Sequence, residues 1–339
     1  MDSIGIYMPR WLYRSDVSDR MFADELIKSI EQSGRYRPLP LDVPKLRLVS
    51  ARDAEAFCAD NRLVAIAQHD SRFYAKDERY HANVDLLERY VPFVNSTKAQ
   101  RIGHDKIATK VALKQKNVPF LEDKVVVSAQ ELEEHLEEGK WYVIKPPDLG
   151  AGAGVKLVKK RAGVLFGYHD GKWRVIEAKD KKNEGGIAVT YRAGLASPML
   201  AIQKLHIDFT YPRMLVEPYF NDEERGFSSL RCTVIGNEVV EAVKRVNRRN
   251  ITSNVSSGGR AEKWELSDAQ KAMAIAAKNA IGADYAGVDM LVANGKSVIG
   301  EVNIGPFTLF GRYTGVNVGK LFGAYLMDKL LAKLHVGYY

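Results

Sequence analysis

The stretch AGVDMLVANGKSVIGEVN, residues 286–303, holds two alternating apolar runs on either side of an Asn-Gly dipeptide at 294–295, a pattern typical of a tight β-hairpin. Glu301 and Asn303 are two residues apart on the second run and should point to the same face of the strand. The first run supplies Asp289. Carboxylate and amide oxygens are the ligands that Mg²⁺ and Mn²⁺ prefer, so these three side chains are candidate metal ligands.

The register of this hairpin decides whether the three side chains share a face. With a two-residue loop, Asp289 would lie opposite Gly300 and on the other face from Glu301. With a three-residue loop, residues 293–295, it would lie opposite Ile299 and all three would share a face. The metal hypothesis therefore requires the longer loop. The alternative is an ordinary hairpin whose acids face solvent.

The composition indicates a globular chain with more than one lobe. Its 339 residues, 46% of them hydrophobic, exceed the roughly 250–300 at which single cores stop growing. No stretch approaches the roughly 20 apolar residues of a membrane helix, and the N-terminus lacks a secretory pattern, so we expect a cytoplasmic protein. Cys58 and Cys232 lie far apart and match no paired metal spacing, which predicts buried thiols.

The chain is basic, with a formal charge of +8 and a pI near 9.2. Nucleic acid, phosphorylated small molecules and acidic peptides are all compatible with this charge, and its sign alone does not choose among them. The densest basic runs are KKR at 159–161 and KDKK at 179–182. A solvated surface is the favoured interpretation of both runs.

The N-terminal part alternates short apolar runs with helical patterns, which predicts a small parallel α/β lobe of Rossmann-like type over residues 1–94. Two helices broken at Gly103 should follow, the second capped by Asp105 and ending before Pro119. After residue 120 the pattern changes to short strands, including a hairpin turning at 236–237. The segment after Ser267 predicts a helix with a capping box completed by Gln270 and with Gly282 past its end.

Two further segments could bind a ligand. In WYVIKPPDLGAGAGV, residues 141–155, an apolar strand ends at Lys145, and the glycines that follow would let backbone N–H groups approach phosphate; these are Gly150, Gly152 and Gly154. The alternative is a flexible β-turn. In RMLVEPYFNDEE, residues 213–224, Pro218 places the strand end at an edge or hinge. That hinge could hold an adenine and a ribose, or it could be a plain strand end.

In this order the segments resemble the ATP-grasp superfamily, and most closely its RimK-type carboxylate–amine ligases and their glutathione-synthetase-like relatives, over about residues 94–325. The resemblance implies an α+β ATP-grasp fold, in which two α+β subdomains grip ATP, behind the small N-terminal lobe. It places the ATP-grasp domain at 95–335, with a lid subdomain at about 118–216 and a catalytic subdomain at about 217–335.

The resemblance also implies the roles of individual residues. ATP would be bound by Lys106, Lys145, Gly150, Gly152, Gly154, Glu217, Tyr219 and either Glu223 or Glu224, with Glu224 preferred. The metal ligands Asp289, Glu301 and Asn303 would hold two Mg²⁺ ions, with Mn²⁺ as the alternative.

The sequence departs from the family pattern in several places. Asn303 is followed by Ile-Gly-Pro-Phe where relatives have Ser-Pro-Gly, and Ser229 stands where relatives carry an Asp before the strand arginine. The Arg-x-Asn of relatives is Thr-Ser-Asn at 252–254, so Arg248 or Arg249 is assigned to replace that arginine, and Ser257 and Gly258 are further substrate candidates. Residues 156–212 form a basic insertion similar to one in spore-coat-associated ATP-grasp proteins.

The activity implied is an ATP-dependent ligase that joins a carboxylate to an amine through an acylphosphate and releases ADP and phosphate. Arg245 is chosen to stabilise the oxyanion, and Arg231 lies on the paired strand. Strict alternation puts Lys244 on the other face of the strand. The Ser-, Asn- and Gly-rich loop at 247–260 is either a lid that excludes water or a disordered linker.

Two other functions remain open on the sequence. The first is an ATP-grasp kinase in which the basic insertion grips a phosphorylated acceptor, and the second is a structural or binding protein of the spore-coat-associated type. The expected partners are ATP and small carboxylate and amine substrates, such as an amino acid or a peptide. Nucleic acid and membranes are not expected, and homo-oligomers are common in the family.

Overall fold

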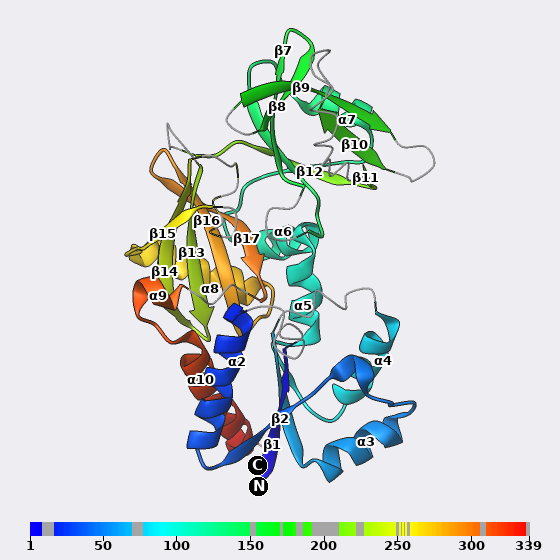
Figure 1. Ribbon diagram of the computed structural model, residues 1–339, viewed down its shortest axis with the longest axis vertical. Helices are drawn as coiled ribbons and strands as arrows, with labels where there is room; N and C mark the ends of the chain where they lie inside the picture. Colours follow the sequence, from blue (N-terminus) through cyan, green and yellow to red (C-terminus); the bar gives the residue numbers. More distant parts are fainter. Residues whose placement is uncertain are drawn as a thin grey trace.

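The chain folds into three sheets with helices packed against them (Figure 1). The structure is a computed structural model that describes residues 1–8, 17–69, 77–149, 154–169, 172–180, 186–191, 210–221, 227–248, 251, 253, 255, 258–305 and 310–336. Within these residues the sheets span 2–94, 124–218 and 227–303. The predicted α+β class is therefore confirmed, whereas the domain boundaries at 94/95 and 216/217 stay a prediction.

The N-terminal sheet has the order β2-β1-β3-β4 and is parallel at each strand pair, as predicted. Its strands are β1 (Asp2–Tyr7), β2 (Tyr36–Pro40), β3 (Leu63–Gln68) and β4 (Phe93–Val94). Its helices are α2 (Val17–Gln32), the 3₁₀ turn η1 (Val43–Lys45), α3 (Ala51–Asp60) and α4 (Glu78–Leu87). One face of the sheet packs on α2 and the other on α3 and α4, so β1 and β3 are buried along almost their whole length.

Two short helices, α5 (Thr97–His104) and α6 (Lys106–Gln115), connect this lobe to the rest of the chain. The Asp105 side chain accepts hydrogen bonds from the backbone N–H groups of Ile107 and Ala108, which confirms the predicted N-cap. The predicted break at Gly103 is wrong, because α5 continues through it. An added Cβ there would lie 3.1 Å from Ile304 Cβ, so this glycine permits close packing.

The upper sheet has eight strands in the order β11-β10-β9-β8-β7-β6-β12-β5 within the described residues. Its elements are β5 (Lys124–Val126), α7 (Ala129–His135), β6 (Trp141–Lys145), β7 (Lys156–Arg161), β8 (Val164–His169), β9 (Lys172–Asp180), β10 (Ile187–Tyr191), β11 (Thr210–Tyr211) and β12 (Met214–Pro218). The predicted insertion contributes β7 to β11, which extend the sheet outward from β6 as successive antiparallel neighbours. The insertion is thus an enlargement of this sheet.

The third sheet has the order β15-β14-β13-β16-β17. Its elements are β13 (Phe227–Ile235), β14 (Glu238–Asn247), β15 (Arg260–Lys263), α8 (Asp268–Ala280), β16 (Tyr285–Ala293) and β17 (Lys296–Asn303). The predicted hairpin at 236–237 and the capping box of α8 are both confirmed. One face packs apolar side chains against α8, whereas β13 presents Ser229, Arg231 and Thr233 on the other face, and all three are buried.

The last helices are α9 (Gly311–Thr314) and α10 (Val318–Val336), and α10 runs beside α2 (Figure 1). An added Cβ at Gly319 would lie 2.6 Å from the backbone oxygen of Phe22, so the two helices approach closely here. This seam joins the end of the chain to the N-terminal lobe. In the described part of the chain, no helix has the length and apolar character needed to cross a membrane.

Candidate active site

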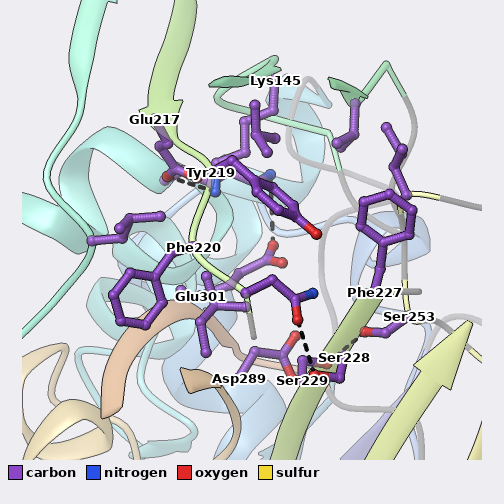
Figure 2. Close-up of a pocket in the computed structure, with 18 of the residues that line it drawn as sticks. Lys145, Glu217, Tyr219, Phe220, Phe227, Ser228, Ser229, Ser253, Asp289 and Glu301 are labelled. Atoms are coloured by element: carbon purple, nitrogen blue, oxygen red, sulfur yellow. Dashed lines mark hydrogen bonds and ion pairs between the residues drawn. The ribbon is translucent and has the colours of Figure 1, made fainter. Parts of the chain in front are cut away.

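A pocket opens between the upper sheet and the five-stranded sheet, next to the first turn of α6 (Figure 2). Its empty volume, which includes solvent at the open mouth, is about 970 Å³. Each of the two sheets and α6 contributes charged side chains to its wall, namely Lys106, Lys145, Glu217, Arg245, Asp289 and Glu301. The structure thus gathers into one pocket residues that are almost 200 positions apart.

The hairpin of β16 and β17 differs from both registers that the sequence suggested. Its loop has only two residues, 294–295, both with positive φ as in a type I′ turn, so the three-residue loop is wrong. Asp289 nevertheless lies directly opposite Glu301. The register shifts between Asp289 and Met290, where Gly300 is the extra residue of a β-bulge. The bulge places the two carboxylates on one face without the longer loop.

The third predicted metal ligand joins this face. Asn303 lies opposite Gly287 and therefore projects to the same side as Glu301. The side chains of Asp289 and Glu301 are 12% and 30% exposed. In the ranges that the structure describes, no group of three or more His, Cys, Asp or Glu side chains could hold a metal, so the amide of Asn303 is needed to complete the set. An oxygen-only set of this kind fits Mg²⁺.

Two arginines on neighbouring strands hold Asp289. Arg231 on β13 is its direct partner in the sheet and donates through both Nε and Nη2, with Nη2 2.9 Å from Oδ2. Arg245 on β14 places Nη2 2.9 Å from Oδ1. Burial opposes ionisation, but the two guanidinium groups keep the pKa of Asp289 below its ordinary value. A metal here would share Asp289 with the arginines, and Glu301 and Asn303 would supply further oxygens.

The expected alternation along β14 is confirmed. Lys244 lies over the Trp264 ring, with Nζ 5.3 Å from the ring centroid, whereas Arg245 points into the site. Arg245 Nη2 also donates to Ser229 Oγ at 2.7 Å, and that hydroxyl lies 2.6 Å from Ser253 Oγ. Ser229 thus links Arg245 to the loop that follows β14.

The two predicted phosphate lysines enter the pocket from different elements. Lys106 is the first residue of α6, and its Nζ donates to the Leu149 carbonyl and lies 3.6 Å from Glu301 Oε1. Lys145 is the last residue of β6, and its Nζ lies 2.7 Å from Glu217 Oε1. Both lysine side chains are about nine-tenths buried, at 12% and 11% exposure. They form a cationic wall facing the carboxylates.

Glu217 is almost fully buried among lysines, as Figure 2 shows for Lys145. Lys110 Nζ donates to the same Oε1 atom at 2.6 Å. Burial raises the pKa of Glu217, but Lys145 and Lys110 outweigh it and hold that pKa below the ordinary value. Conversely, burial lowers the pKa of Lys145, and Glu217 outweighs this and raises it. Because the Glu217 carboxylate is already paired with two lysines, an adenine at this hinge would contact the backbone or the Tyr219 ring instead.

Aromatic rings line the hinge side of the pocket. The Tyr219 ring points into the pocket in Figure 2, and its centroid lies 5.5 Å from that of Trp141 and 5.9 Å from that of Phe227. Phe220 lines the same wall. The Tyr219 backbone N–H donates to the Trp141 carbonyl at 2.9 Å, which fixes the hinge on β6. Flat apolar side chains of this kind suit a planar aromatic ligand.

The remaining predicted residues divide into two groups. Three are described: Gly154 has a φ of +72°, Gly258 has a φ of +86°, and Arg248 is exposed just after β14. The others lie outside the described residues: Gly150, Gly152, Glu223, Glu224, Arg249 and Ser257. Ile251 and Ser253, in the loop predicted to be a lid or linker, line the pocket.

The sequence reasoning missed Lys110 and its partner Asp123, whose Oδ1 lies 3.0 Å from Lys110 Nζ. A signal for Lys110 was present. It is three residues before the buried Leu113 and four after Lys106, which places it on the inward face of α6. A lysine on an inward face needs a partner, and the partner could not be identified without the tertiary structure.

Comparison with known proteins agrees with this geometry. Residues 195–326 match the family of RimK-like ATP-grasp domains. This segment of the chain is therefore similar to RimK-like ATP-grasp domains. The match runs from before β11 to the first half of α10, and therefore covers the strands that carry Arg231, Arg245, Asp289 and Glu301. The family resemblance predicted from the sequence is confirmed.

Individual relatives support the same assignment. The tetrahydromethanopterin:alpha-L-glutamate ligase of Methanocaldococcus jannaschii is 27% identical over 249 residues, which cover 73% of this chain and 72% of the relative. A probable alpha-L-glutamate ligase of Pasteurella multocida is 35% identical over 116 residues, 34% of this chain and 37% of the relative. The match to this second relative thus spans only about a third of that relative's length.

Solved structures share the fold across the whole chain. A RimK domain ATP-grasp protein from Sphaerobacter thermophilus superposes with a TM-score of 0.56 at 17% identity, covering 96% of this chain and 99% of its own. D-alanine–D-alanine ligase from Bacillus anthracis superposes with a TM-score of 0.57 at 15% identity, covering 99% and 98%. At these identities the likeness shows the fold alone, and it confirms the predicted ATP-grasp architecture.

Proposed function

We propose that this protein is an ATP-dependent carboxylate–amine ligase that works through an acylphosphate and releases ADP and phosphate. One observation carries the proposal: the oxygen ligands Asp289, Glu301 and Asn303 share one face, and Lys106 and Lys145 lie across the same pocket. Anionic oxygens opposite two lysines suit a polyphosphate that is bridged to the protein by metal. The alpha-L-glutamate ligase names of the relatives support an enzyme that forms C–N bonds with an amino-acid substrate.

The residues divide the work of phosphoryl transfer between them. Lys106 and Lys145 would bind phosphate oxygens as point charges delivered from a helix and a strand. Tyr219 and Phe220 would bind the adenine at the hinge. Asp289, Glu301 and Asn303 would hold Mg²⁺, which when bound neutralises developing charge on the phosphoryl group. We propose that these ligands hold two Mg²⁺ ions, with Mn²⁺ as the alternative metal.

The arginines would serve the second half of the reaction. An amine that attacks an acylphosphate generates a tetrahedral oxyanion, which a fixed cation stabilises. Arg245 is nine-tenths or more buried, lines the pocket and is held by Asp289 and Ser229. Arg231 grips Asp289 bidentately and so fixes the carboxylate against which Arg245 is aligned. Arg245 would therefore touch the substrate, and Arg231 would orient Arg245 through Asp289.

Hydroxylamine trapping tests the acylphosphate directly. The protein is incubated with Mg-ATP, a pool of amino acids and other carboxylates, and hydroxylamine, which converts an acylphosphate to a hydroxamate. We expect hydroxamate together with ADP, and we expect Glu301→Gln to reduce it by at least about 100-fold, because even outer-shell partners of a metal cost 10–100-fold. Glu262→Gln, on the exposed part of β15, is the matched control.

The opposite outcome is also defined. ATP consumption with a phosphorylated alcohol as product and no hydroxamate would favour the kinase and overturn the ligase proposal. ATP binding without any turnover in either screen would favour a binding role.

A further inference from the structure

The side-chain cluster behind the pocket contains a lysine that the reaction above does not use. Lys110 is 6% exposed and lies on α6, one turn after Lys106. Its ammonium donates to the Leu121 carbonyl at 2.7 Å and pairs with Asp123 at 3.0 Å and Glu217 at 2.6 Å. A fully buried lysine is rare unless its partners are this complete.

Lys110 and Lys145 both contact the same carboxylate oxygen of Glu217. Both ammonium groups lie against Oε1 of Glu217, at 2.6 and 2.7 Å. Lys145 and Glu217 line the pocket, whereas Lys110 does not. The cluster therefore has an inner cation held by protein groups and an outer cation next to the space for the ligand.

The charges explain why two lysines are present. A buried carboxylate that loses its only cation is strongly destabilised, so a single lysine paired with Glu217 would be retained there and could not bind a phosphate. With Lys110 in place, Glu217 keeps a cation when Lys145 turns away. Asp123 balances the second positive charge, so the four groups carry no net charge when all are ionised.

We propose that Lys110 is a positioning residue for nucleotide binding: it keeps Glu217 paired from behind the pocket and so allows Lys145 to pass from Glu217 to a phosphate of the nucleotide. The inference rests on the proposed function only in taking ATP as the nucleotide. Lys110 acts through Lys145 and touches no substrate. Its effect should therefore appear in nucleotide affinity and should vanish when Lys145 is absent.

A double-mutant cycle on the full chain tests this coupling, with the dissociation constant of Mg-AMPPNP measured by calorimetry. We expect Lys110→Met to weaken binding about tenfold, within the coupling range of contacting groups. We expect Lys145→Met to weaken it further, and the double variant to bind like Lys145→Met alone. Lys114→Met, at an exposed position of the same helix, should bind like the wild type.

A second variant separates coupling from simple damage to the fold. Asp123→Asn leaves Lys110 with Glu217 as its remaining acidic partner, so it should release Lys145 and bind nucleotide as tightly as the wild type or more tightly. General damage would weaken binding in both the Lys110 and Asp123 variants, in step with a loss of thermal stability. This variant carries the test if Lys110→Met does not fold.

The outcomes distinguish this inference from the proposed function. Three results would overturn the role of Lys110. Lys110→Met could bind Mg-AMPPNP as tightly as the wild type, or Asp123→Asn could weaken binding as much as Lys110→Met does. The double variant could also lose affinity by the product of the two single losses, which would mean that the two lysines act independently. A wild-type protein that binds no Mg-AMPPNP would overturn the proposed function itself. Hydroxamate formation by the wild type together with unchanged affinity in Lys110→Met would refute only the inference.

Discussion

At the scale of single residues, the face of the five-stranded sheet that carries the site holds several buried side chains that can ionise. Asp289 pairs with both Arg231 and Arg245, so the three buried side chains together keep one positive charge. Glu241, on the same strand as Arg245, has a different environment. Its carboxylate accepts hydrogen bonds from Thr233 Oγ1 at 3.1 Å and Thr314 Oγ1 at 2.6 Å, and among the described residues no lysine or arginine forms an ion pair with it.

Glu241 should make the protein less stable as pH rises. Burial raises its pKa above the ordinary value of about 4.3. The folded state then binds more protons than the unfolded state between the ordinary pKa and the raised one, so the free energy of unfolding falls as pH increases through that window. Glu241→Gln cannot ionise; its amide keeps one oxygen to accept from one hydroxyl and offers its NH₂ group as a donor to the other hydroxyl oxygen.

We therefore expect Glu241→Gln to gain stability relative to the wild type between pH 4.5 and pH 7, by about 1.4 kcal/mol for each unit of the raised pKa. Denaturant unfolding of both proteins at the two pH values measures this. The same difference between the proteins at both pH values would contradict the assignment.

At the scale of elements, α6 is the support for two of the lysines. Its N-cap Asp105 bonds the first turn and also pairs with Arg213 at 3.0 Å, next to β12 of the upper sheet. Lys106 and Lys110 therefore depend on one cap for their position. The backbone N–H of Lys106 donates to the Pro147 carbonyl at 2.9 Å, which ties the same turn to the segment after β6.

Asp105→Ala should destabilise the protein by about 1 kcal/mol, the usual cost of a lost N-cap. It should also weaken nucleotide binding, because the first turn that carries Lys106 loses its anchor. Asp105→Ser is the matched control, since serine caps the helix without pairing with Arg213. Denaturant melts and calorimetry compare the three proteins. Equal losses in the Ala and Ser variants would assign the effect to the Arg213 pair instead of the cap.

At the scale of the whole molecule, three sheets are held in one arrangement, and the pocket lies between two of them. The seam between α2 and α10 is one of the contacts that fix this arrangement (Figure 1). A Cβ at Gly319 would lie 2.6 Å from the Phe22 carbonyl oxygen and 3.0 Å from Glu25 Cβ, so the helices could not keep their present distance.

Gly319→Ala should therefore destabilise the protein by about 1–3 kcal/mol through overpacking. A glycine-to-alanine change in an unhindered helix would instead stabilise by about 0.5–1 kcal/mol, so the sign of the effect tests the seam. Denaturant unfolding is the measurement, and Lys320→Ala, at an exposed site of the same helix, is the control. A stabilised Gly319→Ala variant would show that the seam is looser than described.

Local sequence signals determined much of this protein. The Asn-Gly turn, the capping box of α8, the cap at Asp105 and the opposite faces of Lys244 and Arg245 were all predictable. Each depends on backbone geometry within a few residues. The ordered series of motifs also identified the ATP-grasp architecture, which the fold comparisons confirm.

Only the tertiary structure decided how those segments meet. The bulge at Gly300 places Asp289 opposite Glu301, and arginines on two other strands form ion pairs with Asp289. Lys110 pairs with Glu217, which is 107 positions away in the sequence. These contacts join residues that no turn or helical repeat relates. Their partners are selected by burial, since a buried charge is retained only where another element supplies its counter-charge.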